Sequence, residues 1–305
     1  MILTQSKSNF GQKTRKFWFH YGAGYLFVLP ALLMFSVFVI FPFFKSLYLS
    51  FTDWNGATEV IEFIGFQNYA EVFQDDIFWT SLRHNVTWMI VVSFVPIVLG
   101  FGMALLLWTR PFGFLAFRTI YFLPQVIGEG ALAIIWKIIY QPRTGVLYHI
   151  GEAVNLKFLL SSPLATPDAA LWAVMLTAIW AHTGFFFVVL LAGLQNVDRD
   201  LMDAARVDGA NGMQRLYYVI IPQLSHVLTM VTVLALISGL KIFGIIWGMT
   251  RGGPARGTEV IGTYAYNNFS NLGRVGYSSA LTMVMAGLAL IITVVFIRLR
   301  ERGEV

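Results

Sequence analysis

The stretch AALWAVMLTAIWAHTGFFFVVLLAGL, residues Ala169–Leu194, contains no Asp, Glu, Lys or Arg and is long enough to cross a membrane as a helix. The hydrocarbon core of a bilayer needs about 20 mostly apolar residues in helical form. Five other segments meet this requirement, namely Tyr25–Tyr48, Val86–Trp108, Ile120–Tyr140, Leu224–Trp247 and Ser279–Ile297. None alternates apolar and polar residues as the strands of a β-barrel do. The sequence therefore predicts an all-α, polytopic membrane protein with six transmembrane helices.

The composition of the whole chain favours the same class of protein. Hydrophobic residues make up 57% and charged residues 12%, and the mean hydropathy is +0.68. Soluble domains have about 25% charged residues, so this chain has too few charges to cover a soluble surface. Its net charge of +5 comes from scattered Lys and Arg without a basic run, which argues against nucleic-acid binding. The absence of cysteine excludes disulfides and thiolate metal sites.

The basic residues predict how the chain is oriented in the plasma membrane. Six spans place both termini on one side, and cytoplasmic segments are enriched in Lys and Arg. If both termini are cytoplasmic, that side holds twelve of the 21 Lys and Arg: Lys7, Lys13, Arg15, Lys16, Arg110, Arg118, Arg199, Arg206, Arg215, Arg298, Arg300 and Arg302. The first apolar run exceeds the roughly 7–15 residues of a cleaved signal's apolar region, so it is expected to remain as a span. We expect a cytoplasmic segment at 1–24, a transmembrane domain at 25–297 and a cytoplasmic tail at 298–305.

Residues 196–222 join the fourth and fifth spans and carry clear helix start and stop signals. Asp198 is a favourable N-cap, and Gly209 permits the left-handed conformation that ends many helices. Asn211 can cap a second short helix, which Pro222 is expected to terminate. The residues predict two short, rigidly joined helices that project from the membrane. From these signals alone, the segment is either a well-capped surface turn or a part that passes the motion of a soluble domain to the spans.

The spacing Asp203-Ala204-Ala205, three residues, Gly209, nine residues, Val219-Ile220-Ile221-Pro222 resembles the EAA motif of ABC importer permeases. In that family the motif forms a coupling helix, which docks in a groove of the cytoplasmic ATPase. The resemblance therefore implies ATPase-coupling roles for Asp203, Ala204, Ala205, Gly209, Ala210 and Pro222. Three conservative departures from the motif occur: Val219 for Ile, Ile221 for Leu, and Asp203 for the usual Glu, which makes that side chain one methylene shorter.

Further stretches extend the resemblance over nearly the whole chain, closest to the sugar-type, maltose- and glycerol-phosphate-permease-like branch. They are Leu29-Pro30 through Pro42 to Ser50-Phe51-Thr52-Asp53-Trp54, Gly65–Tyr69, Arg118–Pro124, Ala192–Gln195, Thr250–Pro254 and Tyr277–Ala280. Two further positions, outside the motif, depart from the family: Gly244 stands where Asp or Asn is common, and Glu129 stands where Pro or an apolar residue is usual. Both departures concern the translocation path.

The resemblance implies a permease subunit of an ATP-binding-cassette importer in a bacterial or archaeal inner membrane, with alternating access as its mechanism. It implies a heterodimer with a second homologous permease, two ATPase subunits and an extracytoplasmic solute-binding protein. The chain has no G-x-x-x-x-G-K-[ST] loop, so we expect ATP and Mg²⁺ in the partner ATPase, no cofactor on this chain, and no enzymatic activity of its own. The expected solute is a sugar or oligosaccharide, followed by a polyol or a glycerol phosphodiester.

Ionisable and aromatic residues inside the spans are candidates for the substrate path, because buried charge is costly in a membrane. Counted along a continuous helix from Arg118, Glu129 is expected near mid-membrane, either lining a polar cavity, facing the partner permease or marking a span end. His182 is either a helix–helix hydrogen-bond partner or a ligand contact. Lys241, Phe243 and Trp247 are further candidates, because aromatic faces with sparse polar groups suit sugars.

Two other classes of function remain as alternatives. An ion-coupled secondary transporter of a small polar solute predicts matching halves, broken helices and paired midplane carboxylates, whereas only Glu129 is available. A membrane-embedded enzyme requires a catalytic constellation, and no H-E-x-x-H, G-x-S-x-G or clustered His/Asp set occurs.

Overall fold

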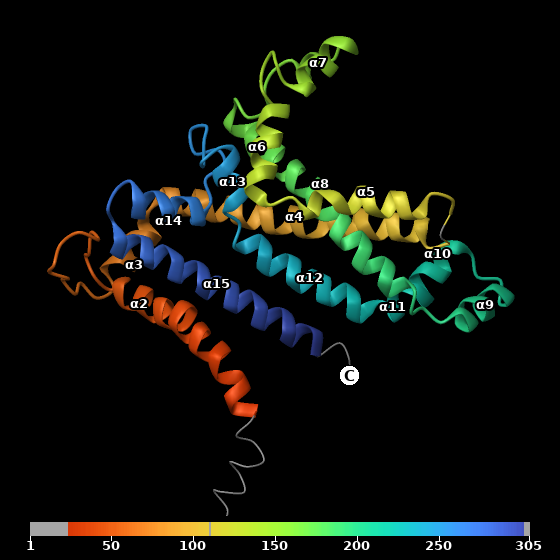
Figure 1. Ribbon diagram of the computed structural model, residues 1–305, viewed down its shortest axis with the longest axis horizontal. Helices are drawn as coiled ribbons and strands as arrows, with labels where there is room; N and C mark the ends of the chain where they lie inside the picture. Colours follow the sequence, from red (N-terminus) through yellow and green to blue (C-terminus); the bar gives the residue numbers. More distant parts are fainter. Residues whose placement is uncertain (1–23, 110, 302–305) are drawn as a thin grey trace, which may run out of the picture.

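The computed structural model describes residues 24–109 and 111–301, so nearly all of the predicted segment at 1–24 and half of the tail at 298–305 lie outside the described residues. Within these two ranges the regular structure is helical, and β pairing is limited to one isolated bridge between Thr52 and Phe63. This confirms the predicted all-α class. The helices form an elongated bundle in which α4 runs along much of the length (Figure 1).

Four helical stretches are long and apolar enough to cross a membrane: Gly24–Leu49, α4 (Asp76–Leu107), α8 (Pro167–Leu194) and the Val275–Phe296 part of α15 (Val275–Glu301). The first contains a π-helical turn, η1 (Ser36–Ile40), followed by α2 (Phe41–Leu49). Two bent helix pairs raise the number of candidate spans to as many as six within the described ranges. The six predicted segments thus all fall on helices, although two of these segments are interrupted.

The third predicted span is broken, contrary to the continuous helix expected from hydropathy. It consists of α5 (Phe114–Val126) and α6 (Glu129–Ile139), which are bent by 101°. Ile127 and Gly128 between them are in extended conformations. Pro124 lies in the last turn of α5 and Gly128 lies in the break, and both residue types disfavour a continuing helix. The position of Glu129 counted along a continuous helix was therefore wrong, because Glu129 begins a new helix in another direction.

The fifth predicted span is also interrupted. The helix α12 (Ser225–Leu240) ends before Lys241, and α13 (Gly244–Met249) starts after the three intervening residues Lys241, Ile242 and Phe243. Asn85 of α4 stabilises this interruption: its Nδ2 donates to the Leu240 carbonyl at 3.1 Å, and its Oδ1 accepts from the Ile261 amide at 2.8 Å. Buried backbone groups freed by a helix break need such partners in a membrane. Phe243 and Trp247 therefore stand at the break and on α13, not on a continuous fifth helix.

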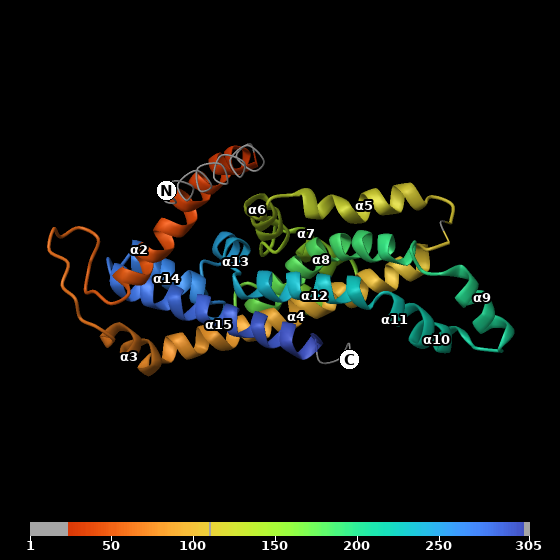
Figure 2. The same ribbon diagram turned by 90° about the horizontal axis from the view of Figure 1, so that it is seen from below.

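The main core lies between α4, α8 and α12, and small residues bring the helices together. A β carbon at Gly184 of α8 would overlap the backbone carbonyl of Tyr121 in α5, and one at Gly100 of α4 would come within 2.7 Å of the Phe187 amide nitrogen. Close approach at small residues is how helices associate in membranes, where the hydrophobic effect between helices is weak. Figures 1 and 2 show α5, α8 and α4 running beside one another over this region.

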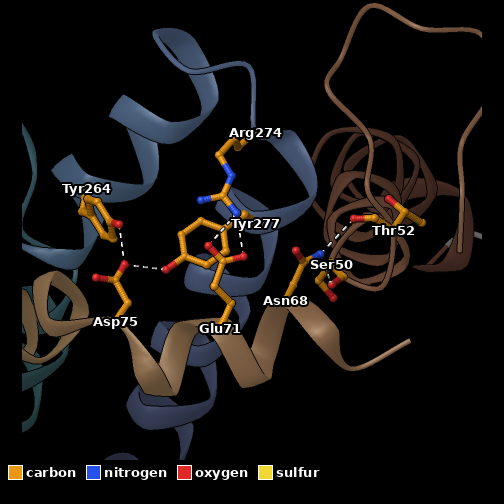
Figure 3. A network of polar contacts seen from close by, with 8 residues as sticks. All are labelled: Ser50, Thr52, Asn68, Glu71, Asp75, Tyr264, Arg274 and Tyr277. Carbon is orange, nitrogen blue, oxygen red and sulfur yellow. Dashed lines mark hydrogen bonds and ion pairs between the residues drawn. The ribbon is translucent and has the colours of Figure 1, made fainter. Parts of the chain in front are cut away.

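The short helices α3 (Gln67–Gln74) and α14 (Ile261–Ser270) lie at one end of the bundle, here called the α3 end (Figure 1). The helices α7 (Val146–Ala153) and η2 (Lys157–Leu159) precede α8 and project from the side of the bundle. Polar contacts join α3 to its neighbours (Figure 3): Asn68 Nδ2 donates to the carbonyls of Ser50 and Thr52, each at 2.9 Å. Arg274 forms an ion pair with Glu71 at 2.6 Å. These contacts fix the end of the first span to α3 and α15.

Candidate functional site

The segment from Asp198 to Gln223 lies at the end of the bundle opposite α3 (Figure 1). We call it the coupling segment after the role that the sequence analysis predicts for it. It contains α9 (Arg199–Val207), α10 (Gly212–Arg215), the π-helical η3 (Leu216–Ile220) and α11 (Ile221–Gln223). The predicted caps are present. The Asp198 side chain accepts from the Asp200 amide at 2.8 Å, and Asn211 and Gln214 form a reciprocal capping box.

Gly209 makes the sharp turn between α9 and α10. Its φ is +79°, which confirms the predicted left-handed conformation. The Ala210 amide donates to the Ala205 carbonyl at 2.9 Å, which satisfies a carbonyl at the end of α9. A β carbon at Gly209 would have no atom within 4 Å, so the turn is open on its outer side.

The coupling segment is fixed to the bundle at both of its ends. Gln223 Oε1 accepts from the Asp198 amide at 2.9 Å, and its Nε2 donates to the Val219 carbonyl at 3.2 Å. Ile220 and Leu224 are buried in the apolar cluster formed with the last turns of α8. One side-chain amide thus joins the start of the segment to its end.

Pro222 does not terminate the second helix, contrary to the prediction. It occupies the first turn of α11, where a missing amide hydrogen costs little, and the helix bends by 72° only at Leu224.

The exposed side of α9 carries the residues that resemble the EAA motif. Ala204 is exposed and Ala205 half-buried. Asp203 Oδ1 accepts from Arg206 at 2.8 Å, and both side chains are more than 60% exposed, so this pair contributes little stability. Asp203 is consequently available to a partner at small cost. The arrangement is a rigid small-residue face that projects from the bundle.

Glu129 and His182, predicted separately, line one cavity of about 330 Å³ between α4, α8 and α12. His182 Nδ1 lies 3.1 Å from Gln125 Oε1, which also lines the cavity. The hydrogen bond to a neighbouring helix, one of the two alternatives given for His182 from sequence, is therefore present. The other alternative, a ligand contact, stays a prediction. The other lining residues are Trp88, Val92, Phe185, Phe186, Leu234, Ala235, Ser238, Gly239 and Ile242. Lys137 lines a different cavity, of about 750 Å³, together with Ser162 and Thr250.

Phe243 and Trp247 form an aromatic cluster with Tyr266, which the sequence did not indicate. The rings of Phe243 and Trp247 stack with centroids 5.7 Å apart, and Tyr266 meets Trp247 edge-on at 4.6 Å. Lys241 is exposed and does not line the cavity of Glu129 and His182. The structure thus joins Phe243 and Trp247 and leaves Lys241 apart.

Gly244, at the start of α13, lies directly against the carboxylate of Glu129. A β carbon at position 244 would overlap Glu129 Oε2. The two departures from the family pattern that concern the translocation path, 115 residues apart in sequence, are therefore neighbours in space.

The fold and these sites can be compared with known proteins. Residues 86–302 match the model of the family described as "binding-protein-dependent transport system inner membrane component". The chain belongs to this family. The permease is 32% identical over 281 residues to a probable ABC transporter permease of Pyrococcus horikoshii, covering 92% of this chain and 96% of that one. It is 33% identical over 280 residues to the trehalose/maltose transport system permease protein MalF of Thermococcus litoralis, covering 90% and 92%.

A solved structure supports the same architecture. The bacterial alginate ABC transporter in complex with an alginate pentasaccharide-bound periplasmic protein contains a chain with a TM-score of 0.80 and 22% identity. The match covers 94% of the permease and 96% of that chain. Together the comparisons show that this chain is a permease subunit of an ABC importer and a multi-pass inner-membrane component, whose relatives are transport subunits and not enzymes.

Proposed function

We propose that the permease forms half of the translocation path for a sugar or related polyol, and that the coupling segment docks on a separate ATPase that binds ATP and Mg²⁺. In this proposal both termini are cytoplasmic, as is the α9 end. Residues 25–297 are the transmembrane domain, and the chain itself binds no cofactor. Asp203, Ala204, Ala205, Gly209 and Ala210 form the docking face, and Pro222 belongs to its rigid base. The single observation that carries the coupling role is that this projecting segment is closed at its base, where Gln223 joins the Asp198 amide to the Val219 carbonyl.

The bundle offers a path for movement from the coupling segment to the cavity. Leu190 and Leu194 of α8 pack with Ile220 and Leu224, and His182 lies two turns earlier on the same unbroken α8. Because packed helices move as rigid bodies, displacement of the coupling segment would shift α8 and α12, which both line the cavity. This geometry supports alternating access driven from the α9 end.

Two observations support a sugar or polyol as the solute. Phe243, Trp247 and Tyr266 present aromatic faces, which suit the C–H faces of sugar rings. The cavity adds Gln125, His182 and Ser238 as hydrogen-bonding groups for hydroxyls. The relative from Thermococcus litoralis is named for trehalose and maltose, which agrees with this chemistry.

The first span supports the proposed second permease subunit. No residue of its most apolar stretch within Gly24–Leu49 is buried in this chain, and the helix leans away from the bundle (Figures 1 and 2). We propose that a second homologous permease packs against part of this helix and lipid covers the rest. An extracytoplasmic solute-binding protein would then deliver solute at the α3 end.

Substitution of Gly209 tests the coupling role. Asn tolerates the left-handed conformation, so Gly209→Asn keeps the turn while adding bulk to the docking face. We expect the detergent-solubilised wild-type permease to copurify a P-loop ATPase. We expect Gly209→Asn to lower ATP-driven uptake of radiolabelled maltose or trehalose by about tenfold or more. A tenfold loss is equivalent to about 1.4 kcal/mol of docking free energy.

Gly65→Asn is the matched control for Gly209→Asn. Gly65 has a φ of +63° and, like Gly209, no atom within 4 Å of an added β carbon, but it precedes α3 at the other end of the bundle. We expect the Gly65→Asn importer to take up the sugar at nearly the wild-type rate. Failure to recover any P-loop ATPase, or equal uptake by the two Asn variants, would contradict the coupling role. An assembled wild-type importer that takes up no neutral sugar would contradict the proposed solute class.

A further inference from the structure

Glu129 and Gly244 form a size-matched pair at the contact between α6 and α13. A β carbon added to residue 244 would overlap Glu129 Oε2. It would also lie 3.3 and 3.5 Å from two carbons of the Glu129 side chain. Even alanine at 244 would displace the carboxylate. Glycine at this position therefore makes room for an acidic group carried by the neighbouring helix.

The Glu129 carboxylate is not used to stabilise the described part of the chain. Within residues 24–109 and 111–301 it has no ion pair and no hydrogen bond. A carboxylate in a membrane span is costly unless it is paired or hydrated in a cavity, so its retention points to a function. Glu129 lines the cavity, which supplies that hydration.

Glu129 also determines the charge of this cavity. Among the described residues that line it, Glu129 is the one Asp or Glu, and neither Lys nor Arg contributes. His182, which also faces the cavity, is hydrogen-bonded to Gln125. A carboxylate accepts hydrogen bonds from hydroxyl and ammonium groups but offers none to an anion. Its negative charge repels a second anion that enters the cavity and attracts a cation.

We propose that Glu129 sets the charge selectivity of the path: it admits neutral or cationic polyhydroxylated solutes and rejects uronates and sugar phosphates, and Gly244 makes its position possible. This rests on the proposed sugar path and narrows its solute class. It excludes the glycerol phosphodiester that the family resemblance left open. It also sets the permease apart from an importer of an acidic polysaccharide such as alginate, the solute named for the structural relative.

The natural absence of cysteine allows a direct test that needs no identified solute. Ser238 is exposed in the chain and lines the cavity, so Ser238→Cys places one thiol near Glu129. In the assembled importer, its modification rate is measured with a cationic trimethylammonium-ethyl and an anionic sulfonato-ethyl methanethiosulfonate, each normalised to its rate with a free thiol. We expect the normalised rate with the cationic reagent to exceed that with the anionic reagent about tenfold or more. In Glu129→Gln the ratio of these two rates should fall close to one.

Two controls separate charge from structure. Ser162→Cys places the thiol in the other cavity, so its ratio should not respond to Glu129→Gln. In the double variant Glu129→Gln with Gly244→Asp, the carboxylate is returned from the opposite helix, and the preference for the cation should reappear.

An unchanged ratio in Glu129→Gln would overturn the proposal, as would a Ser238→Cys thiol that neither reagent reaches while Ser162→Cys reacts. A double variant that stays near one would contradict the assignment of the preference to a carboxylate at this contact. Because thiol modification requires neither sugar nor ATP, a failure of sugar uptake would count against the proposed function and not against this charge selectivity.

Discussion

Asp75 joins three helices at the α3 end of the permease (Figure 3). Its Oδ1 caps α4 by accepting from the Ile77 amide at 2.8 Å, and its Oδ2 accepts from the hydroxyls of Tyr264 and Tyr277. Burial raises the pKa of Asp75, but the two hydroxyls and the backbone amides of Ile77 and Phe78 outweigh it, so the net pKa is lowered from 3.8. A lowered pKa means that the ionised carboxylate stabilises the fold above the unfolded-state pKa and that this stabilisation is lost as the pH falls through the folded-state value.

Asp75→Asn should therefore destabilise the assembled importer at neutral pH. Asn keeps one acceptor but loses the charge-assisted hydrogen bonds, so we expect a loss of roughly 1–3 kcal/mol, seen as a lower midpoint of thermal unfolding by tryptophan fluorescence. The difference from the wild type should shrink as the pH falls below 3.8. The adjacent Asp76 is exposed, so Asp76→Asn should change the midpoint less. Equal midpoints for Asp75→Asn and the wild type at pH 7 would contradict this role.

At the scale of helices, the contact between α5 and α8 depends on Gly184. Any β carbon there would overlap the Tyr121 carbonyl, so Gly184→Ala must push the helices apart. We expect a loss of about 1–3 kcal/mol, the usual range for overpacking, and impaired uptake because α5 carries Gln125. Gly102→Ala in α4 is the control, since an added β carbon meets no atom within 4 Å and alanine favours helix. A Gly184→Ala permease as stable as Gly102→Ala would show that the helices are not packed this closely.

Helix positions and caps were largely predictable because they depend on nearby residues. The uninterrupted α8 follows from one apolar run, and the caps at Asp198 and Asn211 follow from residues within one turn. The breaks after Pro124 and near Phe243 were missed because hydropathy counts apolar residues without regard to backbone direction. Pro124 and Gly128 were the available signals.

The candidate cavity was predictable only in part. Ionisable residues in spans identified Glu129 and His182, but their common cavity depends on the break between α5 and α6. The contact between Glu129 and Gly244, and the addition of Tyr266 to the aromatic cluster, join residues distant in sequence. No local pattern encodes such contacts, so only the packed structure reveals them.

At the scale of the whole molecule, the coupling segment and the cavity lie at different positions along the same helices. The helix α8 contributes His182 to the cavity and Leu194 to the base of the coupling segment, and α12 runs from that base to Ser238. Force applied at the α9 end can thus reach the cavity without a flexible joint in α8. The exposed first span is consistent with the second permease subunit proposed above.

Site-specific crosslinking from the coupling segment tests the central claim most directly. Ala204→Cys places one thiol on the exposed face of α9 in a chain without other cysteines, and a short thiol-to-amine crosslinker is applied to the assembled importer. The account predicts a covalent adduct between the permease and the P-loop ATPase, with none from Ser162→Cys. An Ala204→Cys importer that retains ATP-driven uptake yet forms no adduct with the ATPase would contradict it.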